Sequence, residues 1–163
     1  MTKRFILGLA ALAIVAIGPA HAGSYRAALA ALTHHDDAAA AAIIVPLAEG
    51  GDARAQALLA YMLANGRGVP QSYVEAAYWY RRAGEQGHPT AQYMLGLMYD
   101  KGQGLPQDYV LAYKWLNLAV SRANGRERQE WVLIRDAIAS KLSLAEHTVA
   151  QRLAIEWRPT PYR

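Results

Sequence analysis

The segment with the most ligand-like chemistry spans residues 33–37 (THHDD), where two imidazoles precede two carboxylates on His34, His35, Asp36 and Asp37. These side chains can coordinate zinc and similar metals. Adjacent ligands seldom converge on one ion without distant partners. The alternative is a solvated turn in which Asp36 or Asp37 caps the alanine-rich helix that follows. We favour the capped turn and expect no metal and no cofactor.

Motifs of known catalytic chemistry are missing from the sequence. There is no cysteine to act as a nucleophile or to form a disulfide. The chain also lacks a Gly-x-Ser-x-Gly elbow, a Ser-x-x-Lys pair, a His-Glu-x-x-His pair and a phosphate-binding loop. Gly66-x-Gly68 and Gly102-x-Gly104 lack the rest of a dinucleotide-binding fingerprint, and the ends of helices explain them better. We therefore expect no catalytic residues and no enzyme.

Aromatic residues gather at Tyr78, Trp79 and Tyr80, and Trp115 follows 36 residues after Trp79. Such rings could form a platform for a sugar. The alternative is that the two tryptophans occupy equivalent core positions of a repeat. We favour core packing, because the family resemblance given below places both tryptophans at a core position.

The first 22 residues have the organisation of a secretory signal peptide. Lys3 and Arg4 precede an apolar run over residues 5–17, and residues 20–22 (AHA) provide small side chains for cleavage. A membrane anchor is the alternative, but a helix of this run spans about 20 Å, less than the roughly 30 Å of a hydrocarbon core. We expect a mature protein that starts at about Gly23 and is periplasmic or secreted.

The composition of the mature chain is that of one folded domain with modest charge. Removal of Lys3 and Arg4 lowers the net charge from +4 to +2, and 53% of all residues are hydrophobic against 18% charged. This composition excludes a disordered chain. No stretch concentrates basic residues as nucleic-acid binders do, so we expect no nucleic-acid partner. We also expect no membrane span after signal cleavage.

A repeat of 36 residues dominates the rest of the chain. Residues 52–87 and 88–123 are identical at 13 of 36 positions, which include Gly-x-Gly-x-Pro-Gln and, later, Ala-x-x-Trp. A period of this length is typical of stacked helical hairpins. Each copy predicts a helix, a turn at the paired glycines and a second helix. That second helix is capped by Asp108 in one copy and by Ser72, in a capping box with Glu75, in the other.

The N-terminal flank, residues 23–51, predicts two helices. The first covers residues 24–32, and the second resembles the second helix of a divergent leading repeat. Pro46 lies within this second helix and should cause a kink or a late start.

The C-terminal flank, residues 124–163, predicts two capping helices. The first covers residues 126–142 and carries a periodic apolar face. The second follows Ser143, which is expected to form a capping box with Glu146, and runs to about Trp157.

The two repeat copies resemble Sel1-like repeats, relatives of the tetratricopeptide repeat. The family pattern is Ala-Gln-x-x-Leu-Gly-x-x-Tyr, then Gly-x-Gly-Val, a capping Asp and Ala-x-x-Trp-Tyr. The second copy matches it at Ala91, Gln92, Leu95, Gly96, Tyr99, Gly102, Gly104, Asp108, Ala112 and Trp115. In the first copy Ala60 replaces the glycine and Leu63 the tyrosine. The resemblance implies an all-α fold, a right-handed α-solenoid of stacked helical hairpins with a C-terminal helical cap.

The resemblance also implies a binding surface, because the first helices of such stacks line the concave side. On a helical wheel, Arg54, Ala57 and Tyr61 fall opposite the core position of Leu59. With the equivalents in the second copy, the candidate partner-binding residues are Arg54, Tyr61, Thr90, Tyr93 and Leu97, and the two tyrosines are the strongest. The alternative is that these residues pack against the adjacent hairpin.

By resemblance, this is a short exported bacterial protein of the cell envelope. We expect a non-enzymatic adaptor or regulator that binds a partner protein or peptide through its concave helix face. The first alternative is an envelope enzyme or β-lactam-binding protein, since some exported cysteine-rich Sel1-like proteins are described as binding or hydrolysing β-lactams. The second is a structural protein that associates with peptidoglycan or with itself. This chain lacks the cysteines of the cysteine-rich proteins and a Ser-x-x-Lys motif, so we favour the adaptor.

Overall fold

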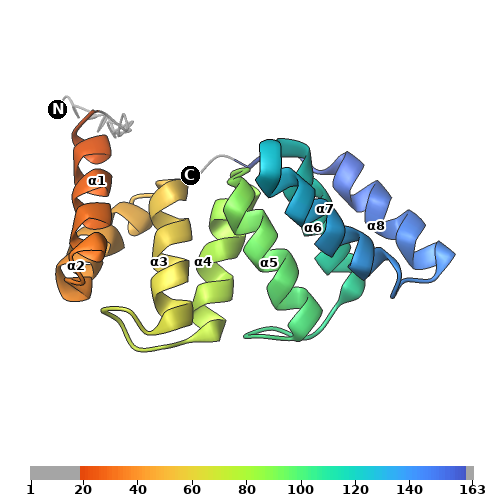
Figure 1. The fold of residues 1–163 in the computed structure, drawn as a ribbon, viewed down its shortest axis with the longest axis horizontal. Coiled ribbons are helices and arrows are strands. Elements are labelled where there is room, and N and C mark those ends of the chain that lie inside the picture. Colours follow the sequence, from red (N-terminus) through yellow and green to blue (C-terminus); the bar gives the residue numbers. More distant parts are fainter. Residues whose placement is uncertain (1–18, 161–163) are drawn as a thin grey trace, which may run out of the picture.

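The computed structural model describes residues 19–160, and every element in this range is an α-helix (Figure 1). The elements are α1 (Pro19–Thr33), α2 (Asp37–Glu49), α3 (Ala53–Asn65), α4 (Tyr73–Glu85), α5 (Pro89–Lys101), α6 (Tyr109–Arg122), α7 (Gly125–Ala139) and α8 (Leu144–Glu156). From α1 to α7 each helix packs on the next along the chain, and α8 packs on α6. The all-α fold of stacked helical hairpins is confirmed. Residues 1–18 of the predicted signal peptide lie outside the described residues.

The two N-terminal helices differ in detail from their prediction. α1 extends beyond the expected residues 24–32 at both ends. α2 begins directly after Asp36, whose side chain accepts the Ala39 N–H at 3.0 Å. The late start predicted from Pro46 is therefore wrong, since the proline lies inside α2 and the helix continues to Glu49. A proline in the last turns removes only one intrahelical hydrogen bond, so the packing of α2 outweighs it.

Side-chain caps begin the four helices of the two repeats. α3 and α5 follow Asp52 and His88, and α4 and α6 follow Ser72 and Asp108. Each of these side chains accepts a backbone N–H of the first helical turn. The predicted caps Ser72 and Asp108 are confirmed. In the described residues the return bond from Glu75 is not formed, so the predicted capping box is only half present.

The connections within the two repeats lie along the same edge of the helix row (Figure 1). The two glycines in each connection have different structural roles. Gly66 and Gly102 end α3 and α5 in the left-handed conformation, with φ of 66° and 68°. Gly68 and Gly104 also have positive φ, but they lie against the backbone of the preceding hairpin. A Cβ atom on Gly104 would overlap the carbonyl group of Tyr73 at the start of α4. Only glycine fits at this contact between hairpins.

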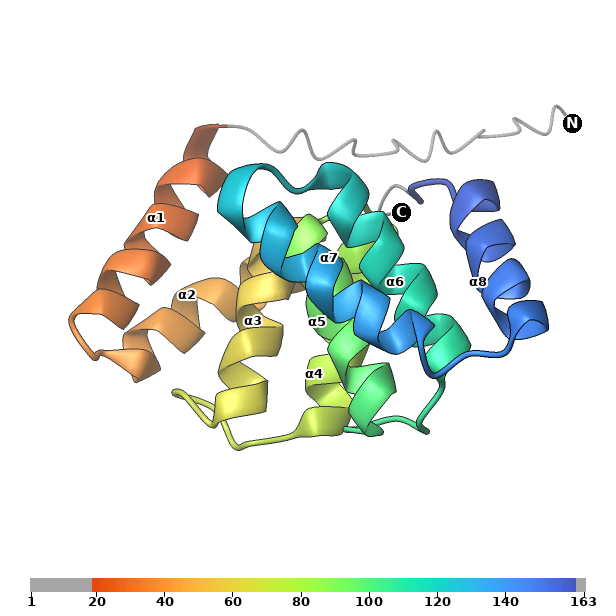
Figure 2. The ribbon, with the colours of Figure 1, turned by 45° about the vertical axis from the view of Figure 1, so that its right-hand side comes forward.

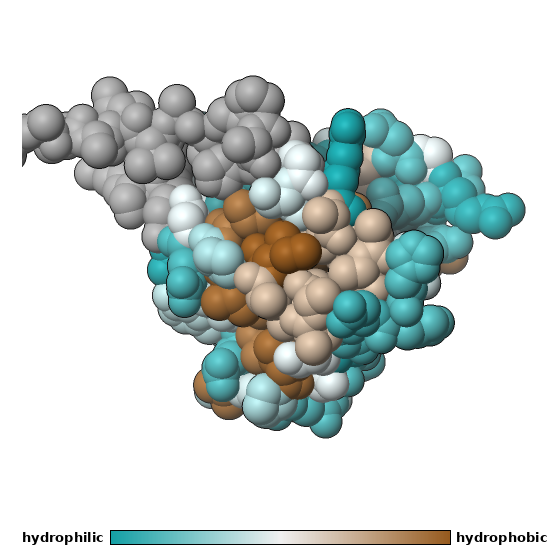
Figure 3. All heavy atoms as spheres, turned by 90° about the vertical axis from the view of Figure 1, so that its left-hand side faces the viewer, coloured by the Kyte–Doolittle hydropathy of each residue, from teal (hydrophilic) through white to brown (hydrophobic). Residues whose placement is uncertain are grey.

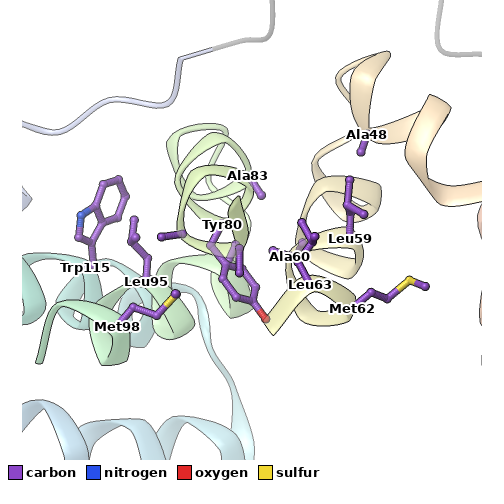
Figure 4. Close-up of a cluster of buried hydrophobic side chains, with 14 of the residues drawn as sticks. Ala48, Leu59, Ala60, Met62, Leu63, Tyr80, Ala83, Leu95, Met98 and Trp115 are labelled. Atoms are coloured by element: carbon purple, nitrogen blue, oxygen red, sulfur yellow. The ribbon is translucent and has the colours of Figure 1, made fainter. Parts of the chain in front are cut away.

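The main apolar core runs through the row of helices, and a smaller buried cluster lies between α6 and α7. Figure 4 shows Leu95 and Met98 from α5 facing the same interior as Tyr80 from α4 and Trp115 from α6. Tyr80 is 2% exposed and Trp115 is 4% exposed, while Trp79 is half-buried and packs on the same core. The core interpretation of Trp115 is confirmed, and its ring is not free to bind a sugar.

The two C-terminal helices close one end of the row. α7 starts one residue before the expected residues 126–142 and ends earlier, at Ala139. α8 begins with the predicted capping box, in which the Glu146 carboxylate accepts the Ser143 N–H at 2.8 Å. The two capping helices are therefore present with shifted ends.

The chain beyond α8 turns back toward the first repeat. The Arg122 guanidinium lies over the ring of Trp157, 4.8 Å from its centroid. The Thr160 N–H donates to the carbonyl oxygen of Glu85 at 2.8 Å. This tail ties the C-terminal helices to the connection between α4 and α5.

The opposite end of the row exposes an apolar surface. Figure 3 views this end and shows hydrophobic residues gathered over α1 and α2. Leu29 on α1 is 38% exposed, and Ala42 on α2 is also exposed. Between residues 19 and 160, none of the helices has the length and apolar character that crossing a bilayer requires.

Candidate functional site

Three of the five predicted partner-binding residues meet in one cavity. Arg54 and Tyr61 from α3 and Thr90 from α5 line a hollow of about 250 Å³, together with Tyr25 from α1. The rest of the lining is Ala57, Leu58, Tyr80, His88 and Met94. We call this hollow the anchor cavity. Most of its lining comes from α1, from α3 and from the start of α5, the first helices of three successive hairpins.

The repeat itself explains why these residues meet. Arg54 is the second residue of α3, and Thr90 is the second residue of α5. Asp52 and His88 cap these helices at the same position of successive copies and so fix both first turns. Equivalent residues of neighbouring hairpins therefore face the same space.

Arg54 is held at the anchor cavity by Asp52. Its Nη2 and Nε donate to the two carboxylate oxygens of Asp52 at 2.9 and 3.3 Å, and its guanidinium lies 5.1 Å from the ring centroid of Tyr25. Burial raises the pKa of Asp52, but hydrogen bonds from the Arg54 side chain and from two backbone N–H groups bring the pKa below its ordinary value. The Asp52 side chain is 7% exposed and that of Arg54 is 48% exposed, so the positively charged Arg54 is the exposed member of this ion pair.

His88, Tyr25 and Tyr80 add uncharged hydrogen-bond donors to the lining of the anchor cavity. Burial lowers the pKa of His88 by more than the nearby Asp52 raises it, so the imidazole is neutral at pH 7. Its Nδ1 accepts the Ala91 N–H at 3.3 Å, which leaves the proton on Nε2. Burial also raises the pKa of Tyr25 and Tyr80, so both phenols stay protonated. This chemistry binds and orients a ligand rather than moving protons.

A second cavity continues the first along α3 and α5. It measures about 150 Å³ and shares Tyr80 and Met94 with the anchor cavity. The rest of its lining is Ala64, Asn65, Tyr73, Met98 and Gln103. The two cavities therefore adjoin, and their lining includes residues from the first turns to the last turns of α3 and α5; we call the pair of cavities the groove.

The other two predicted residues, Tyr93 and Leu97, lie outside this groove. Figure 2 shows α7 crossing the α5 side of the molecule, where Trp131 stacks on Tyr93 with ring centroids 4.6 Å apart and planes at 10°. Leu97 is half-buried on α5 and lines neither cavity. One face of the Tyr93 ring is thus covered by its own chain, as the packing alternative expects. Partner binding by Tyr93 and Leu97 stays a prediction.

The His-Asp segment before α2 has structural partners. Asp36 caps α2, and the Asp37 carboxylate binds the guanidinium of Arg67 at 2.6 Å. Arg67 belongs to the connection between α3 and α4, so this ion pair joins neighbouring hairpins. Within residues 19–160 no group of three or more histidine or carboxylate side chains is placed to hold a metal ion.

Sequence reasoning missed several residues of the groove. Met94 is the equivalent of Leu58, and both line the anchor cavity, so the repeat alignment could have identified them. His88 is an uncommon cap, but its equivalence to Asp52 was a usable signal. No pattern in the sequence could have placed Tyr25, because it lies in a helix outside the repeats.

Comparisons with known proteins agree with this architecture. The Sel1 repeat family matches residues 53–88 and 89–124. The crystal structure of a Sel1 repeat protein from Oxalobacter formigenes aligns with 36% identity and a TM-score of 0.59, over 68% of this chain and 89% of that one. No curated protein gives a significant match.

A second structure extends the comparison over more of the chain. It is a protective antigen present in uropathogenic Escherichia coli strains that displays an SLR fold, with 26% identity and a TM-score of 0.77 over 84% of this chain. Our chain spans only 29% of that protein. Repeats of this kind generally serve as protein–protein interaction modules and are typically not catalytic. The matched repeats and the similarity to nearly the whole Oxalobacter protein show that the chain belongs to the Sel1 repeat family.

Proposed function

We propose that the protein is a non-catalytic adaptor or regulator that binds a segment of a partner protein in the groove along α3 and α5. The observation that carries this proposal is the meeting of Arg54, Tyr61 and Thr90 in one cavity. The repeat pattern does not need a large side chain at these positions for its core. An aromatic ring with a polar tip beside a cation is typical of the centre of a protein interface.

The dimensions of the groove suit an extended segment better than a cofactor. The anchor cavity of about 250 Å³ is smaller than the roughly 300–1,000 Å³ of pockets for drug-sized ligands. The adjoining cavity adds about 150 Å³ beyond the shared Tyr80 and Met94. Two small connected hollows of this kind hold successive side chains of one peptide.

The site of action that we propose is the bacterial cell envelope. The support is the signal-peptide organisation of the first 22 residues. Cleavage before Gly23 would leave Tyr25, and with it the whole lining of the anchor cavity, in the mature protein. An intact-mass measurement on periplasmic material should give a chain that begins at Gly23, and a full-length mass would contradict the proposal.

A photo-crosslinking experiment tests the groove directly. p-Benzoylphenylalanine is placed at Tyr61 or Thr90, and the control variant carries it at Tyr78, which is 51% exposed on α4 and lines neither cavity. In cells of the source bacterium, the two groove positions should yield the same crosslinked partner, and the control should not. Equal yields at all three positions, or no product from the groove positions, would refute the proposal.

A further inference from the structure

The lining of the anchor cavity combines residues that can donate hydrogen bonds with apolar residues. The polar residues are Arg54, Tyr25, Tyr61, Tyr80, Thr90 and His88, whose guanidinium, hydroxyl and Nε2–H groups can donate. The apolar residues are Ala57, Leu58 and Met94. None of the described residues that line the cavity is acidic. A ligand that matches this lining therefore carries hydrogen-bond acceptors next to an apolar group.

Arg54 is prepared in advance for an anionic ligand. Asp52 binds its Nε and Nη2, and the guanidinium lies over the ring of Tyr25, 5.1 Å from its centroid. The side chain is therefore ordered before a ligand arrives, which lowers the entropy cost of binding. Nη1 takes no part in these contacts and is left to donate to a ligand.

Asp52 does not oppose an anion in the cavity. Its carboxylate already accepts four hydrogen bonds, two from the Arg54 side chain and two from the backbone N–H groups of Arg54 and Ala55. It is also buried, whereas the guanidinium is half exposed. A ligand thus meets the positive end of this ion pair.

We propose that the anchor cavity takes the C-terminal residue of a partner chain, with the α-carboxylate at Arg54 and an apolar side chain against Leu58 and Met94. This inference rests on the proposed function and names the part of the partner that is recognised. A C-terminal residue carries a carboxylate and an apolar side chain on one carbon atom, and an internal aspartate or glutamate does not. The residues before the C-terminus then lie in the adjoining cavity, beyond Tyr80.

Peptide pools with defined C-termini provide the test. The first pool contains biotinylated pentapeptides with four randomised positions and a C-terminal leucine with its free carboxylate. The second pool is the same but ends in an amide, and the third is amidated with one internal glutamate. A charge-assisted hydrogen bond predicts that the first pool retains the protein about 10- to 100-fold more strongly than the second. Equal retention by these two pools, retention mainly by the third, or retention by none would overturn the inference.

Variants identify the residues that are responsible. Arg54→Gln should abolish the preference for the free carboxylate, and Arg152→Gln, on the exposed face of α8, should leave it unchanged. Met94→Ala should weaken binding of the leucine pool while the preference for carboxylate over amide persists. Thermal melts test whether each variant is folded, which matters because Arg54→Gln leaves Asp52 with fewer partners.

The crosslinking experiment separates this inference from the proposed function. Crosslinks from Tyr61 without any preference for a free carboxylate would overturn the C-terminal inference and leave the groove in place. Loss of both results would overturn both proposals. An unchanged carboxylate preference in a folded Arg54→Gln variant would contradict the role of the arginine.

Discussion

The two glycines of the connection between α5 and α6, Gly102 and Gly104, should lose different amounts of stability when each is replaced by alanine. In Gly102→Ala the alanine must adopt the backbone φ of 68° that the glycine has. Its Cβ would lie 3.4 Å from the Gln107 Cβ, an ordinary contact distance. A left-handed conformation costs a residue with a Cβ about 1–2 kcal/mol. In Gly104→Ala the φ of 71° is similar, but the Cβ would also overlap the Tyr73 carbonyl and approach the Val74 nitrogen to 2.7 Å. These are backbone atoms, which cannot rotate away.

The expected loss of unfolding free energy in Gly104→Ala is the cost of the overlap with α4 added to the cost of the left-handed conformation. Forcing an extra carbon into a packed contact costs about 1–3 kcal/mol, so Gly104→Ala should lose about 2–5 kcal/mol in total. Urea denaturation followed by circular dichroism measures both variants against the original protein. Gly104→Ala should unfold at clearly lower urea than Gly102→Ala, with a similar slope of the transition. Equal losses in the two variants would show that strain alone matters and that the hairpins do not depend on this contact.

Two further substitutions test buried polar contacts. Gln86→Ala removes the side chain that donates to the buried Gln56 Oε1 at 2.8 Å. Because an acceptor is left unpaired, urea denaturation should show a loss of about 1–3 kcal/mol of unfolding free energy. No loss would mean that water replaces the Gln86 side chain. Asp52→Asn should reduce the dependence of stability on pH in acid. The pKa of Asp52 is lower in the folded chain than its ordinary value, so its contribution is present above about pH 4 and is lost as the pH falls through the folded pKa. Melting curves from pH 7 to pH 2 measure this, and parallel acid profiles for both proteins would contradict it.

The helices and their ends could be predicted because their signals are local. A cap such as Asp108 needs only its own side chain and the next three residues, and Gly102 needs only its own backbone. The 36-residue period then implies stacking, because each hairpin leaves an apolar side uncovered. Of the kink or late start predicted at Pro46, the late start does not occur, since Ile44 and Leu47 are buried beside the proline and their packing holds the helix through it.

The candidate site was only partly predictable because it depends on contacts outside the repeats. The helical wheel placed Arg54 and Tyr61 on the correct side of α3, since that side follows from the helical period. The same wheel could not show that Trp131 of α7 covers Tyr93, or that Tyr25 of α1 supports Arg54. Neither helix belongs to a repeat copy, so no periodicity gives its position.

The return of the C-terminal tail to the α4–α5 connection sets an order of events in folding. The main helix contacts between residues 19 and 160 join neighbours or next neighbours along the chain, so they close short loops at low entropy cost. The bond from Thr160 to Glu85 instead closes a loop of about 75 residues. Its formation has a larger entropy cost than the contacts between neighbouring helices. We therefore expect the tail contact to form late in folding and to open before the helices of the row unwind.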